Sequence, residues 1–208
     1  MFVNFKKIKK EIYSLNAKVN LIVVSKNQPF EALIEILKSG HNNFGENKVQ
    51  EALQKWLDKR VDYTDLRLHM IGRVQSNKVK DIVKLFDFVH SLDSIKLARE
   101  FKEEEQKCGK KLKYFIQVNL AEESKKAGVL IQDLQHLINF SKSNPPLGII
   151  GLMCFPPFGS NPCTYFEKIK ELTYRFKFNE ISMGMSSDYH TAIKYGSTYV
   201  RIGTAIFN

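Results

Sequence analysis

The sequence predicts a single (β/α)8 TIM barrel of the α/β class that extends over residues 1–208. Short apolar runs alternate strictly with amphipathic stretches, and this alternation indicates βαβ units with a parallel sheet. Eight such units match a closed barrel, and a chain of 208 residues lies near the lower limit for that fold. No Pro/Gly-rich linker or low-complexity stretch divides the chain, so one domain is expected.

Each apolar run has the length of a strand, and the first is the wholly apolar VNLIVV of Val19–Val24. Further strands are expected at Asn42–Gly45, Leu66–Gly72, Phe88–Leu92, Lys113–Leu120, Leu147–Phe155, Glu180–Met185 and Thr198–Ile202. Helices are expected between them, at Pro29–Lys38, Lys48–Lys59, Asn77–Phe86, Ile95–Lys107, Ile131–Ser141, Tyr165–Phe176 and Tyr189–Tyr195. Gly40 is positioned to end the first of these helices.

The ends of the chain decide whether the ring of helices is complete. About six residues follow the eighth predicted strand, so the last helix is short, and we expect the N-terminal segment Phe5–Leu15 to fill the gap. A doubly wound open sheet is the alternative fold. That fold usually has a Gly-rich turn after its first strand, and Ser25-Lys26-Asn27-Gln28 is not such a turn.

The formal net charge of +10 favours an anionic partner, either nucleic acid or a phosphorylated small molecule. Lysines outnumber arginines and are spread along the whole chain. Specific reading of nucleic acid relies on arginine forks, so no specific nucleic-acid partner is expected. The simplest interpretation of the charge is a solvated, lysine-rich surface.

The location that the sequence predicts is the cytoplasm. No run reaches about 18 consecutive apolar residues, so no membrane span is expected. The basic segment Met1–Lys10 is not followed by an apolar region, so no secretory leader is expected. Three cysteines form no CxxC pair and are interpreted as reduced thiols: Cys108, Cys154 and Cys163.

The histidines of the sequence do not predict a metal site, because no close pair has metal-ligand spacing. His69 and His90 lie on predicted strands and could face a site in the barrel. We interpret both as core histidines whose ring nitrogens are hydrogen-bonded.

Lys26 is the first candidate for chemistry, because barrel enzymes and binding proteins use the carboxyl ends of their strands. It follows the apolar first strand and shares a face with Ile22 and Val24 if that strand continues. A lysine that projects from an apolar strand surface is partly desolvated. Desolvation favours the neutral amine, which is the form that attacks an aldehyde. The alternative is a surface lysine at a strand end.

The ends of the seventh and eighth predicted strands suggest a phosphate site. Gly184 permits a close backbone approach, and Ser186 or Ser187 is expected to cap the following helix. The backbone N–H groups of Gly203–Ala205 are expected to begin a short helix. Such amides and hydroxyls can surround a phosphate dianion, and barrels most often bind phosphate at these two loops. A simple cap and a turn glycine are the alternative.

Arg201 lies among Tyr199, Val200 and Ile202, where an arginine needs a partner. One interpretation is a hydrogen bond to the pyridine nitrogen of pyridoxal 5′-phosphate (PLP). Arginine keeps its proton, so that nitrogen would stay unprotonated and the ring would be a poor electron sink. The other interpretation is a buried ion pair with a carboxylate.

Several blocks of sequence resemble the pyridoxal phosphate homeostasis protein family, in order, from about Leu21 to Phe207. Together they form a specific signature. The blocks are VVSK (Val23–Lys26), FGENKVQEALQKW (Phe44–Trp56), HMIGRVQSNK (His69–Lys78), HSLDS (His90–Ser94), QVNLAEESKKAGV (Gln117–Val129), GLMCFPP (Gly151–Pro157), SMGMSSDYHTAI (Ser182–Ile193) and GSTYVRIGTAIF (Gly196–Phe207).

The resemblance implies a fold similar to the barrel domain of bacterial alanine racemase, with PLP as the cofactor. Lys26 would hold PLP as a Schiff base, and Ser186, Gly203 and Thr204 would hold its phosphate. The family usually ends its last motif in glycine, whereas this chain has Asn208.

The resemblance also implies the residues around the pyridine ring. Arg201 would face the ring nitrogen and Asn47 would lie near the ring hydroxyl. Met183 and Met185 would lie against the cofactor.

We therefore expect a PLP-binding protein that carries and buffers the cofactor in vitamin B6 homeostasis, with PLP-dependent apoenzymes as recipients. Racemases use two acid–base groups, and in barrel-type racemases the second comes from an added domain of a partner chain. The eighth predicted strand ends about six residues before the end of the sequence, so no such domain, no second base and a monomer are expected. A minimal PLP-dependent racemase or lyase is the alternative, and a charge-driven nucleic-acid binder is the third hypothesis.

Overall fold

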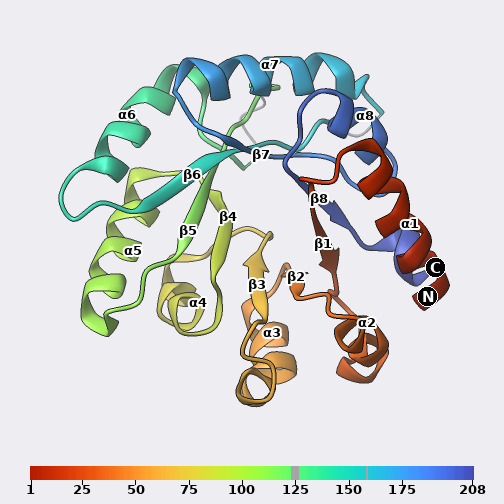
Figure 1. The fold of residues 1–208 in the computed structure, drawn as a ribbon. Coiled ribbons are helices and arrows are strands. Elements are labelled where there is room, and N and C mark those ends of the chain that lie inside the picture. The colour runs from red at the N-terminus through yellow and green to blue at the C-terminus, as the bar shows by residue number, and fades with distance from the viewer. Residues whose placement is uncertain (123–126, 158) are drawn as a thin grey trace.

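The computed structural model describes residues 1–122, 127–157 and 159–208, in which strands and helices alternate as the sequence predicts (Figure 1). The strands of these residues are β1 (Asn20–Val24), β2 (Asn43–Glu46), β3 (Arg67–Met70), β4 (Phe88–Leu92), β5 (Lys113–Gln117), β6 (Gly148–Met153), β7 (Glu180–Ser182) and β8 (Tyr199–Ile202). Their α-helices are α1 (Phe2–Leu15), α2 (Ile34–Lys38), α3 (Val49–Trp56), α4 (Val79–Leu85), α5 (Ile95–Cys108), α6 (Ile131–Lys142), α7 (Pro162–Arg175), α8 (Tyr189–Lys194) and α9 (Thr204–Phe207). Short 3-10 helices are η1 (Phe30–Leu33), η2 (Asp58–Val61) and η3 (Ser76–Lys78).

The strands of the described residues form a closed barrel in sequence order. The barrel closes between its first and last strands, because β1 pairs in parallel with β8 and Asn20 lies opposite Tyr199. On its other edge β1 pairs in parallel with β2. The predicted (β/α)8 fold is confirmed, and the doubly wound open sheet is excluded.

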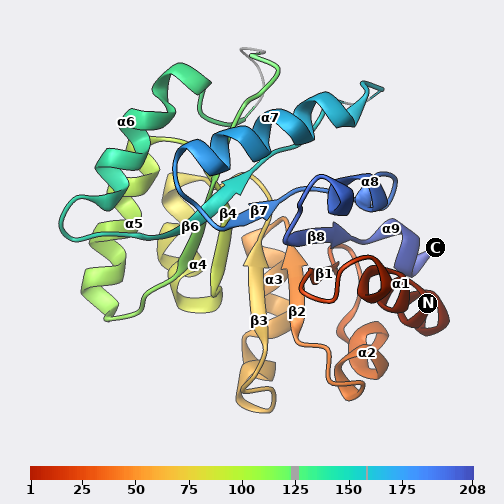
Figure 2. The same ribbon diagram turned by 45° about the horizontal axis from the view of Figure 1, so that its top comes forward.

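Helix α1 completes the ring of helices around the barrel. It packs against α8 and α9, and Figures 1 and 2 show it beside the C-terminal end of the chain. Its buried residues Phe5, Ile8 and Ile12 recur at helical spacing and form one apolar stripe. The prediction that the N-terminal segment fills the gap left by the short last helix is therefore confirmed.

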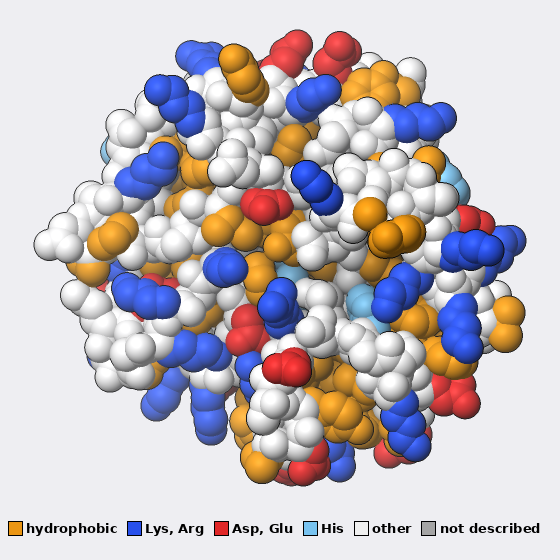
Figure 3. Space-filling model, viewed as in Figure 1, with side chains coloured by type: hydrophobic (Ala, Val, Ile, Leu, Met, Phe, Trp, Pro, Cys, Tyr) orange, Lys and Arg blue, Asp and Glu red, His pale blue; other side chains and the backbone are white. Residues whose placement is uncertain are grey.

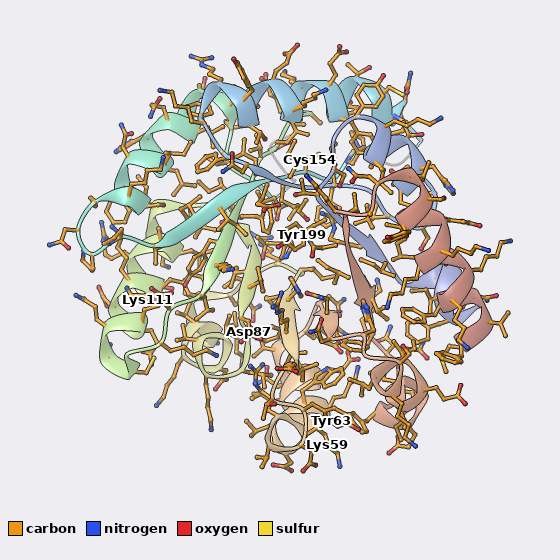
Figure 4. The ribbon with its side chains drawn as sticks, viewed as in Figure 1. Lys59, Tyr63, Asp87, Lys111, Cys154 and Tyr199 are labelled. Carbon is orange, nitrogen blue, oxygen red and sulfur yellow. The ribbon has the colours of Figure 1, made fainter. Side chains whose placement is uncertain are left out.

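The core lies on both sides of the barrel wall, because successive side chains of a strand point alternately inward and outward. The larger cluster fills the layer between the strands and the helices. The inner cluster contains Tyr199, which lies in the middle of the ring of strands in Figure 4. Its other members are Ile22, Phe88, Phe115 and Met153.

Several element boundaries differ from the predicted ones. Helix α7 begins at Pro162, earlier than expected, because Asn161 caps it by accepting a hydrogen bond from the Cys163 N–H at 3.1 Å. Strand β7 ends at Ser182, and Gly184 then adopts a φ of +94°, which a strand cannot contain. The first predicted helix is divided into η1 and α2.

The surface carries its cations in a dispersed arrangement. Figure 3 shows lysine and arginine side chains over all of the visible face, with acidic side chains among them. Among the residues that the structure describes, no helix has both the length and the apolar character that crossing a membrane requires.

Candidate functional site

Lys26 lies in the loop after β1, at the carboxyl end of the barrel, and both of its neighbours are held in place. The Ser25 N–H donates to Gly45 O at 3.0 Å, and the Asn27 N–H donates to Glu51 Oε1. Asn27 has a φ of +59°, which turns the chain away from the strand direction. Lys26 itself is exposed, so the expectation of a partly desolvated side chain on the strand's apolar face is wrong.

The loop that carries Lys26 is anchored on a buried carboxylate. Glu46, at the end of β2, is fully buried, and its Oε1 accepts hydrogen bonds from Ser25 Oγ at 2.8 Å and Trp56 Nε1 at 2.9 Å. Lys55 Nζ lies 2.8 Å from the same oxygen and also donates to Ser25 O at 2.6 Å. Strand β2 and helix α3 thus fix the backbone on the N-terminal side of Lys26.

Asn47 lies directly after β2, next to the buried Glu46. Its side chain is half-buried, and among the described residues its Oδ1 has no hydrogen-bond partner. A buried amide oxygen without a partner is costly, so a ligand group that donates a hydrogen bond would be favoured there.

The loops after β7 and β8 are joined by Ser186. Its Oγ accepts a hydrogen bond from the Ala205 N–H at 3.2 Å, at the beginning of α9. Helix α8 instead begins after Asp188, whose Oδ1 accepts from the Met185 N–H at 2.6 Å. The prediction that Ser186 or Ser187 caps the helix after the seventh strand is therefore wrong.

Gly203 and Thr204 begin the short helix α9, as the sequence predicts for the segment after the last strand. A Cβ atom on Gly203 would lie 3.0 Å from Val24 O, so the glycine lets the end of β8 approach the end of β1 closely. Thr204 is exposed and directly precedes Ala205, whose N–H donates to Ser186 Oγ. The structure thus brings the predicted phosphate-binding loops together.

The two predicted methionines differ in their surroundings. Met183 is fully buried and belongs to the cluster between the barrel and the helices. Its N–H donates to Tyr199 O at 3.1 Å, which ties the end of β7 to β8. Met185 is half-buried.

Arg201 is 2% exposed and points toward a hydroxyl and a carbonyl. Its Nη1 donates to Ser182 Oγ at 2.5 Å and its Nη2 donates to Cys154 O at 3.0 Å. Burial lowers the pKa of the guanidinium to about 10, and the ring of Phe155 lies 4.4 Å away. Among the described residues the Nε of Arg201 is buried without a hydrogen-bond partner and no carboxylate pairs with the side chain, so the interpretation as a buried ion pair is wrong.

A chain of hydrogen bonds continues from Arg201 across the barrel interior. His90 Nδ1 lies 2.8 Å from Ser182 Oγ, and His90 Nε2 lies 3.0 Å from His69 Nδ1. His69 Nε2 lies 3.1 Å from Asn43 Oδ1. Since Ser182 accepts from Arg201, its own proton can go to His90, and each imidazole then donates onward to the next acceptor.

This chain explains both histidines and identifies Ser182 as a residue that the sequence analysis missed. His69 and His90 are fully buried and stack on Phe88 and Phe115. Burial lowers the pKa of His69 to about 3 and that of His90 well below its ordinary value, so both rings are neutral. The prediction of core histidines with hydrogen-bonded rings is confirmed. The feature of the sequence that could have identified Ser182 is a serine on the inward face of an otherwise buried strand.

The barrel and the polar groups at its carboxyl ends define the class of protein. The chain matches the family profile described as "Alanine racemase, N-terminal domain" over residues 2–208. An alanine racemase from Corynebacterium glutamicum has the same fold, with a TM-score of 0.69 at 14% identity over 96% of this chain and 58% of that chain. The protein is thus a barrel of the alanine racemase N-terminal type.

Closer relatives identify the family within this class. A pyridoxal phosphate homeostasis protein of Vibrio alginolyticus is 40% identical over 202 residues, which cover 91% of this chain and 85% of the relative. That of Escherichia coli K12 is 34% identical over 199 residues, with coverages of 91% and 85%. The PLP-bound structure of PipY from Synechococcus elongatus has a TM-score of 0.87 at 33% identity, over 97% of this chain and all of that chain. The chain belongs to the pyridoxal phosphate homeostasis protein family.

Proposed function

We propose that this protein binds PLP reversibly, holds it as a Schiff base on Lys26, and buffers its supply to PLP-dependent apoenzymes in the cytoplasm. The observation that carries the proposal is the buried, unpartnered Nε of Arg201 at the carboxyl end of the barrel. A donor that is buried without an acceptor is costly, and the pyridine nitrogen of PLP is an acceptor of matching kind. The PLP-bound relative PipY and the names of the curated relatives support the choice of cofactor.

The loops after β7 and β8 fit the phosphate group of PLP. Ser186, Gly203 and Thr204 bring together two hydroxyls and the backbone amides at the start of α9. Gly203 allows this backbone to approach the end of β1, on the side from which Lys26 follows. We infer that these groups bind the phosphate while the Lys26 amine condenses with the aldehyde and releases water.

The residues around Arg201 favour storage of the cofactor over turnover of an amino acid. Arginine keeps its proton even at a lowered pKa of about 10, so it would leave the pyridine nitrogen unprotonated. His69 and His90 cannot serve as a base at the mouth of the barrel, because both rings are fully buried and hydrogen-bonded within its interior. We therefore propose a carrier without a second catalytic base.

Substitution of Lys26 tests the proposal directly. Purified protein soaked in PLP is expected to gain the near-visible absorbance of a Schiff base, and borohydride followed by peptide mapping is expected to locate the added mass on Lys26. Lys26→Ala is expected to lose the absorbance while its thermal unfolding stays unchanged, because the side chain is exposed. The matched control is Lys38→Ala, another exposed lysine at an element end, which is expected to keep it.

Two results would contradict this function. Modification of another lysine in the peptide map would remove Lys26 from the site. Steady, Lys26-dependent turnover of any amino acid in a panel would support the minimal racemase or lyase instead of the carrier.

A further inference from the structure

A pocket opens between the loops that follow β2 and β3, at the same end of the barrel as Lys26. Its volume of about 550 Å³ falls within the range of small-molecule sites. Three buried apolar residues line it, Val49, Met70 and Val74. Such a surface can contact the apolar body of a ligand.

The polar part of the pocket is cationic. Lys48, Arg73 and Lys78 all line it, and among the described residues none of those that line it is acidic. Within the described part of the chain, neither lysine takes part in an ion pair. Both lysines are therefore available to an anion.

The acidic residues near this pocket do not remove its positive charge. Arg73 interacts with Asp93, whose pKa is raised by burial and lowered in part by the Arg73 charge. Glu51, in the first turn of α3, instead accepts a hydrogen bond from the Asn27 N–H and lies 3.4 Å from Lys55 Nζ. Neither of these carboxylates lines the pocket, whereas Lys48, Arg73 and Lys78 do, so positive charge is in excess there.

The two loops that form the pocket are packed against each other. A Cβ atom on Gly72 would collide with the backbone of Asn47, so only glycine allows this contact. Gly72 O also accepts a hydrogen bond from Ser91 Oγ at 2.5 Å. The pocket therefore has a fixed shape before any ligand binds, which reduces the entropic cost of binding.

Two polar side chains from the segment that leads into α4 line this pocket. No side chain of the described residues caps η3 or α4, so the polar side chains of Gln75-Ser76-Asn77-Lys78 are not used as helix caps. Gln75 and Lys78 line the pocket instead. Asn47, which the family resemblance places near the ring hydroxyl of PLP, also lines the pocket, so the pocket adjoins the proposed cofactor site.

We propose that this pocket binds a small organic phosphate, with its phosphate against Lys48, Arg73 and Lys78 and its organic body against Val49, Met70 and Val74. Three cations match a phosphate dianion better than the single charge of a carboxylate. The amide groups of the pocket supply further donors. This site is separate from the loops after β7 and β8, and its occupation does not require Lys26 to carry a cofactor.

Calorimetric titration with phenyl phosphate of PLP-loaded protein, from which unbound PLP has been removed, tests this site while the cofactor's own phosphate site is filled. Phenyl phosphate is expected to bind more tightly than inorganic phosphate, which lacks an organic body, and than benzyl alcohol, which lacks the charge. The double variant Arg73→Gln/Lys78→Gln is expected to weaken phenyl phosphate binding about tenfold or more, since two charge-assisted contacts are lost.

The control variant Lys80→Gln/Lys84→Gln removes two exposed charges from α4 and is expected to change the affinity less than about twofold, because neither residue lines the pocket. Equal loss in both variants, no binding at all, or inorganic phosphate binding as tightly as phenyl phosphate would each overturn the proposal. Titration of Lys26→Ala separates this inference from the proposed function, because phenyl phosphate binding is expected to persist there while the Schiff-base absorbance is lost.

Discussion

Arg201 combines a full charge with almost complete burial, and its hydrogen bonds go to the hydroxyl of Ser182 and the carbonyl of Cys154. Both bonds involve its terminal nitrogens, so they fix the plane of the guanidinium and leave Nε free. Ser182 is itself held by His90 at 2.8 Å. The contacts with Ser182, His90 and Cys154 thus set the direction in which the unpartnered Nε–H of Arg201 points.

Arg201→Gln is expected to raise the pKa of the Schiff base on Lys26 by about one unit. The positive charge of Arg201 disfavours the protonated imine, and glutamine removes that charge. The measurement is a pH titration of the near-visible absorbance of the PLP-loaded protein. Ser182→Ala is expected to shift the titration in the same direction by a smaller amount, because Arg201 loses one of its two anchors. Identical titrations of Arg201→Gln and the parent would rule out a role at the ring.

Ser186→Ala and Thr204→Val are each expected to weaken PLP binding by about 1–2 kcal/mol, the scale of a hydrogen bond to a charged group. Equilibrium dialysis against PLP measures the change. Ser187→Ala is the matched control, because Ser187 is an exposed hydroxyl in the same loop and is expected to leave the affinity unchanged. Unchanged affinity in both test variants would remove these residues from the phosphate site.

At the scale of elements, the loop after β1 depends on β2 and α3. Glu46 Oε1 accepts hydrogen bonds from Ser25, Lys55 and Trp56, and its Oε2 has no partner among the described residues. Glu46 and Lys55 are both almost fully inaccessible to solvent. A buried carboxylate in this setting depends on its cation, so the loss of Lys55 leaves an uncompensated charge.

Lys55→Met is expected to lower the free energy of unfolding by about 3–5 kcal/mol, the typical cost of breaking a buried ion pair from one side. Denaturant unfolding measures it. Lys48→Met, at an exposed position just before the same helix, is expected to change stability by less than about 0.5 kcal/mol. A small effect of Lys55→Met would mean that water reaches Glu46 in solution.

At the scale of the whole molecule, the barrel buries neutral histidines. Burial lowers the pKa of His41 to about 4 and that of His69 to about 3, and it lowers that of His90 well below its ordinary value. In the unfolded chain each ring titrates near pH 6.5. Below that pH the unfolded chain binds protons that the folded chain does not, so stability is complete above about pH 6.5 and falls as the solution is acidified.

The free energy of unfolding is therefore expected to decrease as the pH is lowered from 6.5 toward 4, by roughly 1.4 kcal/mol per pH unit for each buried histidine. Urea unfolding at several pH values measures this slope. His41→Gln is expected to reduce the slope of the unfolding free energy with pH by the roughly 1.4 kcal/mol per pH unit that one buried histidine contributes. His136→Gln, at an exposed position, is expected to leave the slope unchanged. Stability that does not change between pH 6.5 and 4.5 would contradict this account.

The alternation of apolar runs and amphipathic stretches was sufficient to predict the barrel, because strand and helix periods are local properties. It also predicted that Lys26, Ser186, Arg201, Gly203 and Thr204 would follow or end strands at one end of the barrel, and the family resemblance added Asn47. It failed for the helix cap at Ser186, since the N–H group that donates to this serine belongs to Ala205, just after a strand that is distant in sequence.

By itself, the sequence determined the fold and the strand ends that carry the candidate site, because hydrophobic periodicity and the order of strands and helices are properties of consecutive residues. Only the tertiary structure decided which groups pair. It joined Arg201 to Ser182 and His90, anchored Ser25 on Glu46 and Lys55, and left Lys48, Arg73 and Lys78 around a common pocket. Hydrogen bonds and charges act over a few ångströms in space, so partners that are distant in sequence are selected only when the barrel closes.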